Sequence, residues 1–142
     1  MTFEGDGTES GTSIPPRRKV PHYHGDEVRI LFFVSALVLI VAQSTGAALP
    51  FSTLGAVVVA VLLVVAAGIT NPGQSWIHWL NAFLATVGTL LFGTTAIEHY
   101  RAGMSIFDTS FLYVEALALL SLVALYFTTR TIRGLVQRPD SV

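Results

Sequence analysis

Cysteine is absent from this sequence of 142 residues, and charged residues are scarce. Without cysteine, the chain has no disulfide, no thiolate metal ligand and no cysteine nucleophile. Only 12% of the residues are charged, whereas a soluble domain carries roughly a quarter. The 8 basic and 9 acidic residues give a formal net charge of −1, so no excess of positive charge indicates binding to nucleic acid.

Apolar residues take the place of the missing charge. They make up 52% of the chain, and the mean hydropathy is +0.64. The clearest apolar run starts at Trp76 and Trp79, contains no Asp, Glu, Lys or Arg through Ile97, and ends at Arg101. A run of about 20 apolar residues with aromatic residues at its ends has the length and the boundaries of a transmembrane helix. The sequence predicts four such spans, at about residues 28–49, 54–70, 76–97 and 109–128.

These spans predict an all-α fold, an integral membrane four-helix bundle with short loops. We expect residues 1–27 to form a disordered cytoplasmic tail with a basic juxtamembrane segment, because residues 1–14 are rich in Gly, Ser and Thr and carry acidic charge. Residues 28–129 form the membrane domain, and residues 130–142 form a short cytoplasmic tail. The membrane is predicted to be a plasma membrane, of the bacterial inner-membrane type.

The distribution of basic residues predicts the orientation. Four spans place both chain ends on one side of the membrane. Seven of the eight Lys and Arg residues lie before or at the start of the first span, or after the last span: Arg17, Arg18, Lys19, Arg29, Arg130, Arg133 and Arg138. Only Arg101 lies in a connection between spans. Since basic residues are enriched on the cytoplasmic side, both termini are expected in the cytoplasm.

Small residues at helical spacing predict the packing faces. On the first span the predicted inward face carries Ser35, Leu39, Ala42 and Gly46, and on the second it carries Ala56, Ala60 and Ala67. The third span has a small and polar stripe opposite a leucine-rich side, so we expect it to lie centrally in the bundle; the stripe contains His78, Ala82, Thr86, Thr89, Gly93 and Ala96.

Turn and capping residues separate the predicted spans. Ser52 or Thr53 is expected to cap the second helix, and Ser75 the third. Asn71-Pro72-Gly73 is a strong turn signal. Before the fourth span, Ser105 and Asp108 have the spacing of a capping box, and Asp108 is interpreted as a helix cap.

Glu115 is the ionisable residue predicted to lie deepest in a span, about 9 Å from the start of the fourth helix at 1.5 Å per residue. A carboxylate inside a membrane is a candidate functional residue. We predict that Glu115 shares an outer polar layer with Gln43, Thr94 and Thr95. A second layer, near the inner face, is expected to contain Ser35, Asn81 and Ser121, with His78 just below it. Each layer could hydrogen-bond the helices together, or Glu115 could bind a proton or cation.

No motif for catalysis or for binding a cofactor stands out in the sequence. A nucleophile, a base and an orienting group do not occur together in any recognisable pattern, so the sequence predicts no enzyme and no cofactor. The segment HYHGDE at residues 22–27 contains four possible metal ligands, His22, His24, Asp26 and Glu27. A polar collar beside the membrane is the simpler interpretation, and no metal site is assigned.

The sequence therefore leads to one main hypothesis and two alternatives. The main hypothesis is a small multi-pass membrane protein that acts as a structural, accessory or assembly subunit, with lipid and other membrane subunits or copies of itself as partners. The first alternative is a homo-oligomeric proton- or cation-coupled transporter that uses Glu115. The second alternative is a metal sensor formed by HYHGDE.

Overall fold

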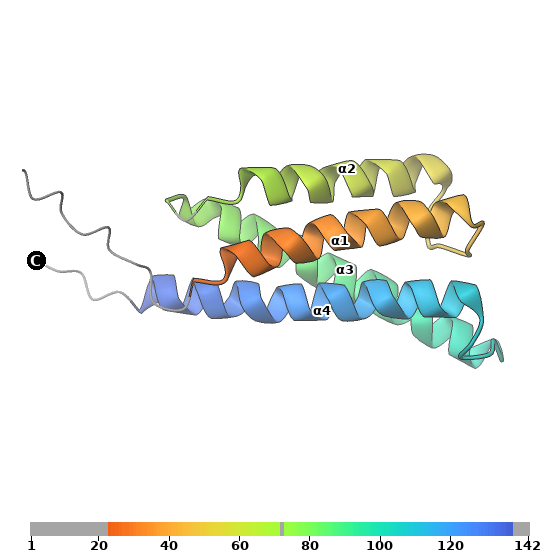
Figure 1. The fold of residues 1–142 in the computed structure, drawn as a ribbon. Coiled ribbons are helices and arrows are strands. Elements are labelled where there is room, and N and C mark those ends of the chain that lie inside the picture. Colours follow the sequence, from red (N-terminus) through yellow and green to blue (C-terminus); the bar gives the residue numbers. More distant parts are fainter. Residues whose placement is uncertain (1–22, 72, 138–142) are drawn as a thin grey trace, which may run out of the picture.

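The computed structural model describes residues 23–71 and 73–137, so most of the predicted N-terminal tail and the last five residues lie outside the described structure. The described residues form four α-helices and no strand: α1 (Gly25–Ser44), α2 (Thr53–Ile69), α3 (Ser75–Arg101) and α4 (Thr109–Val136). Figure 1 shows consecutive helices running in opposite directions along the bundle. The prediction of an all-α fold with four helices is confirmed.

Glycines and capping side chains set several helix boundaries. α1 ends at Ser44 rather than near residue 49, because Gly46 adopts φ 75° and turns the chain. Ser52 caps α2 as predicted, since its Oγ accepts a hydrogen bond of 3.2 Å from the backbone N–H of Gly55. Asp108 caps α4 by accepting a 2.8 Å hydrogen bond from the N–H of Ser110.

Two predicted caps are wrong. Ser75 is the first residue of α3 rather than its cap, and Gln74, which precedes it, makes no capping hydrogen bond with its side chain. Ser105 does not begin a helix. Its Oγ instead accepts a hydrogen bond from the N–H of Phe107 within the connection, at 3.3 Å.

The connections define two ends of the bundle. At the terminal end, α1 begins, α4 ends and the short connection joins α2 to α3. At the opposite end lie the α1–α2 and α3–α4 connections (Figure 1). The predicted turn at Asn71-Pro72-Gly73 is described except for residue 72. Its neighbours do form a turn, because the N–H of Gln74 donates to the Asn71 carbonyl at 3.2 Å.

The helices are ordered α2, α1, α4, α3 by their packing. α1 packs along both α2 and α4, α4 also packs along α3, and α2 and α3 meet at only a few positions. Figure 1 shows α3 crossing behind the other helices and diverging from α2 towards the opposite end. The prediction that the third span lies centrally is therefore wrong, because α1 and α4 form the central pair.

Small side chains on the buried faces let the helices approach closely. The predicted faces of α1 and α2 are confirmed, with Ser35, Leu39 and Ala42 buried on the first and Ala56, Ala60 and Ala67 buried on the second. Gly46 is exposed beyond the end of α1. Gly88 on α3 lies close against α4, where an added Cβ would lie 2.6 Å from Ser121 Oγ and 3.2 Å from Ser121 Cβ.

The buried face of α3 is rotated relative to the prediction. Its buried residues are Ile77, His78, Asn81, Ala85, Phe92, Thr95 and Ala96. Of the predicted inward stripe, Thr86 is exposed. On the leucine side, Leu84 and Leu91 line an internal cavity instead of facing outwards. The small stripe thus lies partly on the outside of the bundle.

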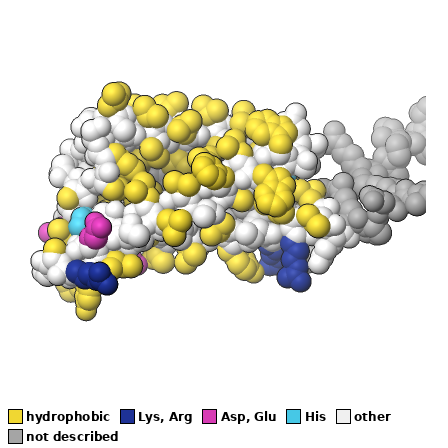
Figure 2. All heavy atoms as spheres, turned by 180° about the vertical axis from the view of Figure 1, so that it is seen from behind, with side chains coloured by type: hydrophobic (Ala, Val, Ile, Leu, Met, Phe, Trp, Pro, Cys, Tyr) yellow, Lys and Arg dark blue, Asp and Glu magenta, His cyan; other side chains and the backbone are white. Residues whose placement is uncertain are grey.

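Large apolar side chains cover the outer faces of all four helices. Figure 2 shows them over the whole length of one side of the bundle, with the charged side chains near its two ends. Exposed apolar residues include Ile30 and Leu37 on α1, Val58 and Val61 on α2, Trp79 and Phe83 on α3, and Leu112 and Leu119 on α4. Among the described residues, α3 and α4 are long and apolar enough to cross a membrane, while α2 is apolar but has 17 residues.

The contact between Gly88 and Ser121 leads to a prediction about stability. Gly88→Leu should force α3 and α4 apart and lower the free energy of unfolding by about 1–3 kcal/mol, as overpacking does. Thermal unfolding in detergent, followed by circular dichroism, measures the effect. Gly68→Leu on α2 is the matched control, because nothing lies within 4 Å of a Cβ added there. Equal melting temperatures for the two variants would show that α3 and α4 are not closely packed at Gly88.

Candidate functional site

Buried polar side chains gather at the terminal end, where all four helices meet. His78 and Asn81 of α3 are 2% and 1% exposed, and Thr70, Thr128 and Thr131 are also buried. We call these five residues the terminal cluster. Asn81, which was predicted in the inner layer, and His78, predicted just below it, therefore lie inside the bundle. Ser35 and Ser121, which were predicted in the same layer, lie nearer the middle of α1 and α4 and are buried as well.

A chain of hydrogen bonds joins α3 to α2 at this end. Asn81 Nδ2 donates to Thr70 Oγ1 at 3.0 Å. The Thr70 hydroxyl in turn donates to the carbonyl of Ala66 at 2.7 Å. This chain lies close to the short α2–α3 connection, the region from which the two helices diverge. Thr70 thus ties Asn81 to the last turn of α2.

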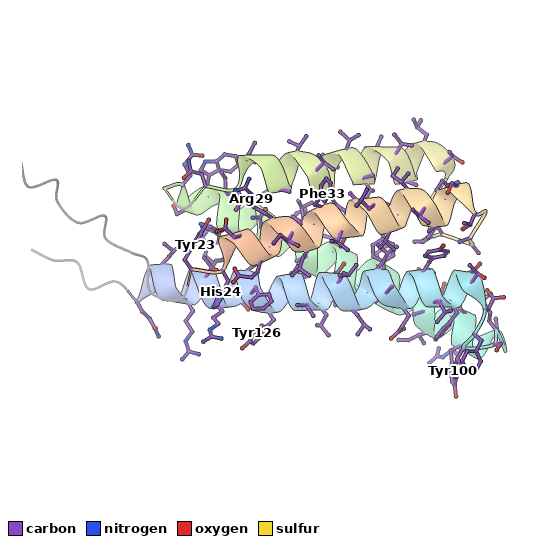
Figure 3. All side chains as sticks on the ribbon, viewed as in Figure 1. Tyr23, His24, Arg29, Phe33, Tyr100 and Tyr126 are labelled. Atoms are coloured by element: carbon purple, nitrogen blue, oxygen red, sulfur yellow. The ribbon has the colours of Figure 1, made fainter. Side chains whose placement is uncertain are left out.

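Two residues at the start of α1, His24 and Arg29, form hydrogen bonds to neighbouring helices at the same end (Figure 3). The backbone N–H of His24, just before α1, donates to Thr131 Oγ1 on α4 at 3.1 Å, and the His24 ring lies 5.2 Å from the ring of Phe127. Arg29 Nε donates to the Ala67 carbonyl at 3.0 Å. That carbonyl is among the last four of α2, which have no partner within the helix, so the Arg29 guanidinium caps the negative end of the α2 dipole.

Two buried atoms of this cluster have no hydrogen-bond partner among the described residues, His78 Nε2 and Asn81 Oδ1. The Tyr23 ring packs edge-on to the His78 imidazole, with the ring centroids 5.9 Å apart. Burial, together with nearby Asp26, raises the pKa of the Tyr23 phenol, so its hydroxyl stays uncharged at neutral pH. A buried amide oxygen and a neutral imidazole nitrogen can each accept a hydrogen bond from a water molecule.

The predicted ligand segment HYHGDE is only partly described, because His22 lies outside the described residues. His24 Nδ1 lies 3.5 Å from Glu27 Oε1, and Asp26 Oδ1 lies 3.7 Å from Arg29 Nη1. Within residues 23–71 and 73–137 no three His, Asp or Glu side chains come close enough to hold a metal ion. The described part of the segment therefore makes pairs of local contacts.

Gln43 and Thr94 form hydrogen bonds that do not involve Glu115. Gln43 Nε2 donates to Thr53 Oγ1 at 2.9 Å and so joins the end of α1 to the start of α2. Thr94 is exposed, and its hydroxyl donates to the Leu91 carbonyl of its own helix at 3.0 Å. The hydrogen bonds found among the described residues include none between these two side chains and Glu115. The three residues lie on three different helices, α1, α3 and α4, and a shared outer polar layer stays a prediction.

Glu115 instead lines a groove between α3 and α4, which we call the Glu115 groove. The groove has a volume of about 380 Å³ and is lined by Thr89, Gly93, Ala96, Ile97, Tyr100, Phe111, Glu115, Ala118, Leu119 and Leu122. Its α3 residues recur every three or four positions and include much of the small stripe that was expected to face inwards. A carboxyl group thus lies in a groove whose other residues are mostly apolar.

A separate internal cavity of about 170 Å³ lies where α2 and α3 diverge. It is lined mostly by apolar side chains of α1, α2 and α3, including Phe32, Leu63, Leu84 and Phe92, and its polar lining residues are Ser35 of α1 and Ser121 of α4. The Ser35 hydroxyl donates to the Leu31 carbonyl of its own helix at 2.8 Å. At the opposite end Phe51 packs edge-on against Phe92, with centroids 5.7 Å apart, and partly fills the gap between α2 and α3.

Sequence reasoning missed three residues of the terminal cluster: Thr70, Thr128 and Thr131. Thr128 and Thr131 donate to carbonyls four residues earlier on α4, at 2.7 and 3.0 Å, which lets a hydroxyl be buried in a helix. Their spacing of three residues was the available signal. It was overlooked because the fourth span was predicted to end near residue 128, whereas α4 continues to Val136.

The link between Asn81 and Thr70 can be tested with a double-mutant cycle. Thr70→Val removes the hydroxyl that accepts from Asn81 Nδ2 and should lower the free energy of unfolding by about 1–3 kcal/mol, the cost of leaving a buried polar group unpaired. In an Asn81→Leu background the same substitution should cost clearly less. Thr86→Val is the control, because Thr86 is exposed and bonds only to its own helix. Additive effects of the two substitutions, measured by thermal unfolding in detergent, would contradict a direct link.

Comparison with protein-family models, with curated protein sequences and with solved structures finds no match for this chain. A function must therefore be inferred from the helices, the terminal cluster and the Glu115 groove themselves.

Proposed function

We propose that this chain is an integral membrane protein with four spans, and that it acts as an accessory or assembly subunit within a bacterial-type inner membrane. The apolar outer surface of all four helices is the observation that carries the membrane part of this proposal. A soluble protein rarely exposes a contiguous apolar patch of more than a few hundred Å². Here exposed Leu, Ile, Val, Phe and Trp side chains occur along every helix.

The lengths of α1 and α2 are compatible with crossing a bilayer. At 1.5 Å per residue, the 20 residues of α1 span about 30 Å and the 17 residues of α2 about 26 Å. A hydrocarbon core is about 30 Å thick, and spans of 17–25 residues occur. The charges of α1, on Asp26, Glu27 and Arg29, all lie in its first turns, where an interface between lipid and water would accommodate them.

The positions of the basic residues support cytoplasmic termini. Arg29, Arg130 and Arg133 lie at the terminal end, and Arg101 lies at the opposite end. In the sequence, Arg17, Arg18 and Lys19 precede α1 and Arg138 follows α4. By the positive-inside rule, the terminal end faces the cytoplasm.

The distribution of polar groups favours an accessory role over transport through a single protomer. The internal cavity is lined mostly by apolar side chains, and the buried polar groups concentrate at the terminal end. Glu115 lines an outer groove instead of this cavity. A pathway for ions would have to form between subunits, which keeps the homo-oligomeric transporter as the alternative.

Single cysteine variants can test the four spans and their orientation, because the natural chain has no cysteine. A membrane-impermeant maleimide should label Ala47→Cys and Ser105→Cys from the periplasmic side of intact cells with a permeabilised outer membrane. Gln74→Cys and Gln137→Cys should be labelled only after the inner membrane is opened. Labelling of Gln74→Cys from outside, or of Ala47→Cys only from inside, would contradict four spans with cytoplasmic termini.

Native mass spectrometry of gently solubilised membranes tests the accessory role. The tagged protein should be recovered with a different membrane protein in a fixed ratio. A defined homo-oligomer without a second protein would contradict an accessory role. It would also make ion flux in proteoliposomes, compared between the natural chain and Glu115→Gln, the measurement that decides the transport alternative.

A further inference from the structure

The Glu115 groove combines a carboxyl group with an open apolar surface. Glu115 lies six residues after the start of α4, about 9 Å along the helix axis. Tyr100 and Phe111 belong to the groove near the opposite end, while Leu119 and Leu122 continue it towards the middle of the bundle. In the proposed membrane orientation the groove opens sideways into lipid.

The floor of the groove on α3 is shaped for close approach. Thr89, Gly93 and Ala96 lie on one face of the helix, and nothing lies within 4 Å of a Cβ added at Gly93. Small residues on one face allow a second helix to approach closely in a membrane, where van der Waals packing and hydrogen bonds drive association. A flat helix face would not provide such a recess.

Glu115 gives the groove its chemical preference. The ion pairs found among the described residues, Asp26–Arg29 and His24–Glu27, both lie at the terminal end, and neither involves Glu115. A carboxylate inside lipid is costly unless it pairs with a cation or a hydrogen-bond donor. The groove is therefore complementary to a basic side chain at the depth of Glu115.

We propose that the Glu115 groove binds a transmembrane helix of another protein, one that has a small-residue face and a Lys or Arg at the depth of Glu115. This inference rests on the proposed accessory function and names the class of partner. A second copy of the chain would bring two Glu115 carboxyl groups together without a cation, so it fits the groove less well than a basic helix.

A designed probe helix tests the proposal directly. The probe is a Leu/Ala helix with one small-residue face and a single Lys about six residues inside the interface on the Ser105 side. Fluorescence energy transfer between the labelled probe and the full chain is measured in phosphatidylcholine vesicles, whose lipids carry no net charge. We expect the Lys probe to associate at least ten times more tightly than a probe with Leu at the same position.

Two variants of the chain separate charge from shape. Glu115→Gln should abolish the preference for Lys over Leu, and Gly93→Leu should weaken the binding of both probes by filling the groove. Gly68→Leu, the same change at another open helix position, should leave both affinities unchanged. Melting temperatures of the variants in detergent show whether each one is folded.

Three results would overturn the proposal. The first is equal binding of the Lys and Leu probes, and the second is a preference for Lys that survives Glu115→Gln. The third is energy transfer between two copies of the natural chain that Gly93→Leu abolishes, which would make a second copy the occupant. None of these results bears on the number of spans, which the cysteine variants test separately.

Discussion

Close packing of helices through small side chains is the interaction on which this structure depends. Alanines line the buried faces of α1 and α2, and Gly88 of α3 lies against Ser121 of α4. In lipid, burying a large apolar side chain gains little over leaving it in contact with acyl chains, so tight van der Waals contact has to supply much of the attraction between helices. Larger residues at these positions would hold the helix axes apart and remove that contact.

The unequal packing of the helices explains where the polar groups lie. α2 and α3 are joined by a short connection and by the hydrogen bond from Asn81 to Thr70, and then diverge. At the terminal end, Arg29, His24 and Asn81 each form a hydrogen bond to a neighbouring helix, and at the opposite end Gln43 joins α1 to α2. Towards the opposite end, the space between α2 and α3 is left to the apolar cavity and to the contact of Phe51 with Phe92.

The same packing places Glu115 on the outside of the bundle. α4 presents its buried face, with Val114, Leu117 and Ser121, to the rest of the bundle. Glu115 is adjacent to Val114 in the sequence and so points about 100° away from it around the helix, into the groove beside α3. A carboxyl group in that position favours interaction with another molecule over a role inside one protomer. The position of Glu115 therefore supports both the proposed accessory role and a basic helix as the partner.

The sequence by itself determined the four helices, the inward faces of α1 and α2, and two of the caps, Ser52 and Asp108. These features depend on local spacing and on side-chain hydrogen bonds within a few residues, which the sequence displays directly.

The sequence also identified Glu115, His78 and Asn81 as unusual polar residues in apolar segments. Only the tertiary structure decided their surroundings: His78 and Asn81 lie in a buried cluster, and Glu115 lines an outer groove and makes no described hydrogen bond to Gln43 or Thr94. Helical periodicity shows which residues share a face, but the rotation of a helix against its neighbours depends on how all the facing side chains fit together. In α3, Gly88 lies against Ser121 of α4, and the predicted inward stripe lies partly on the outside of the bundle.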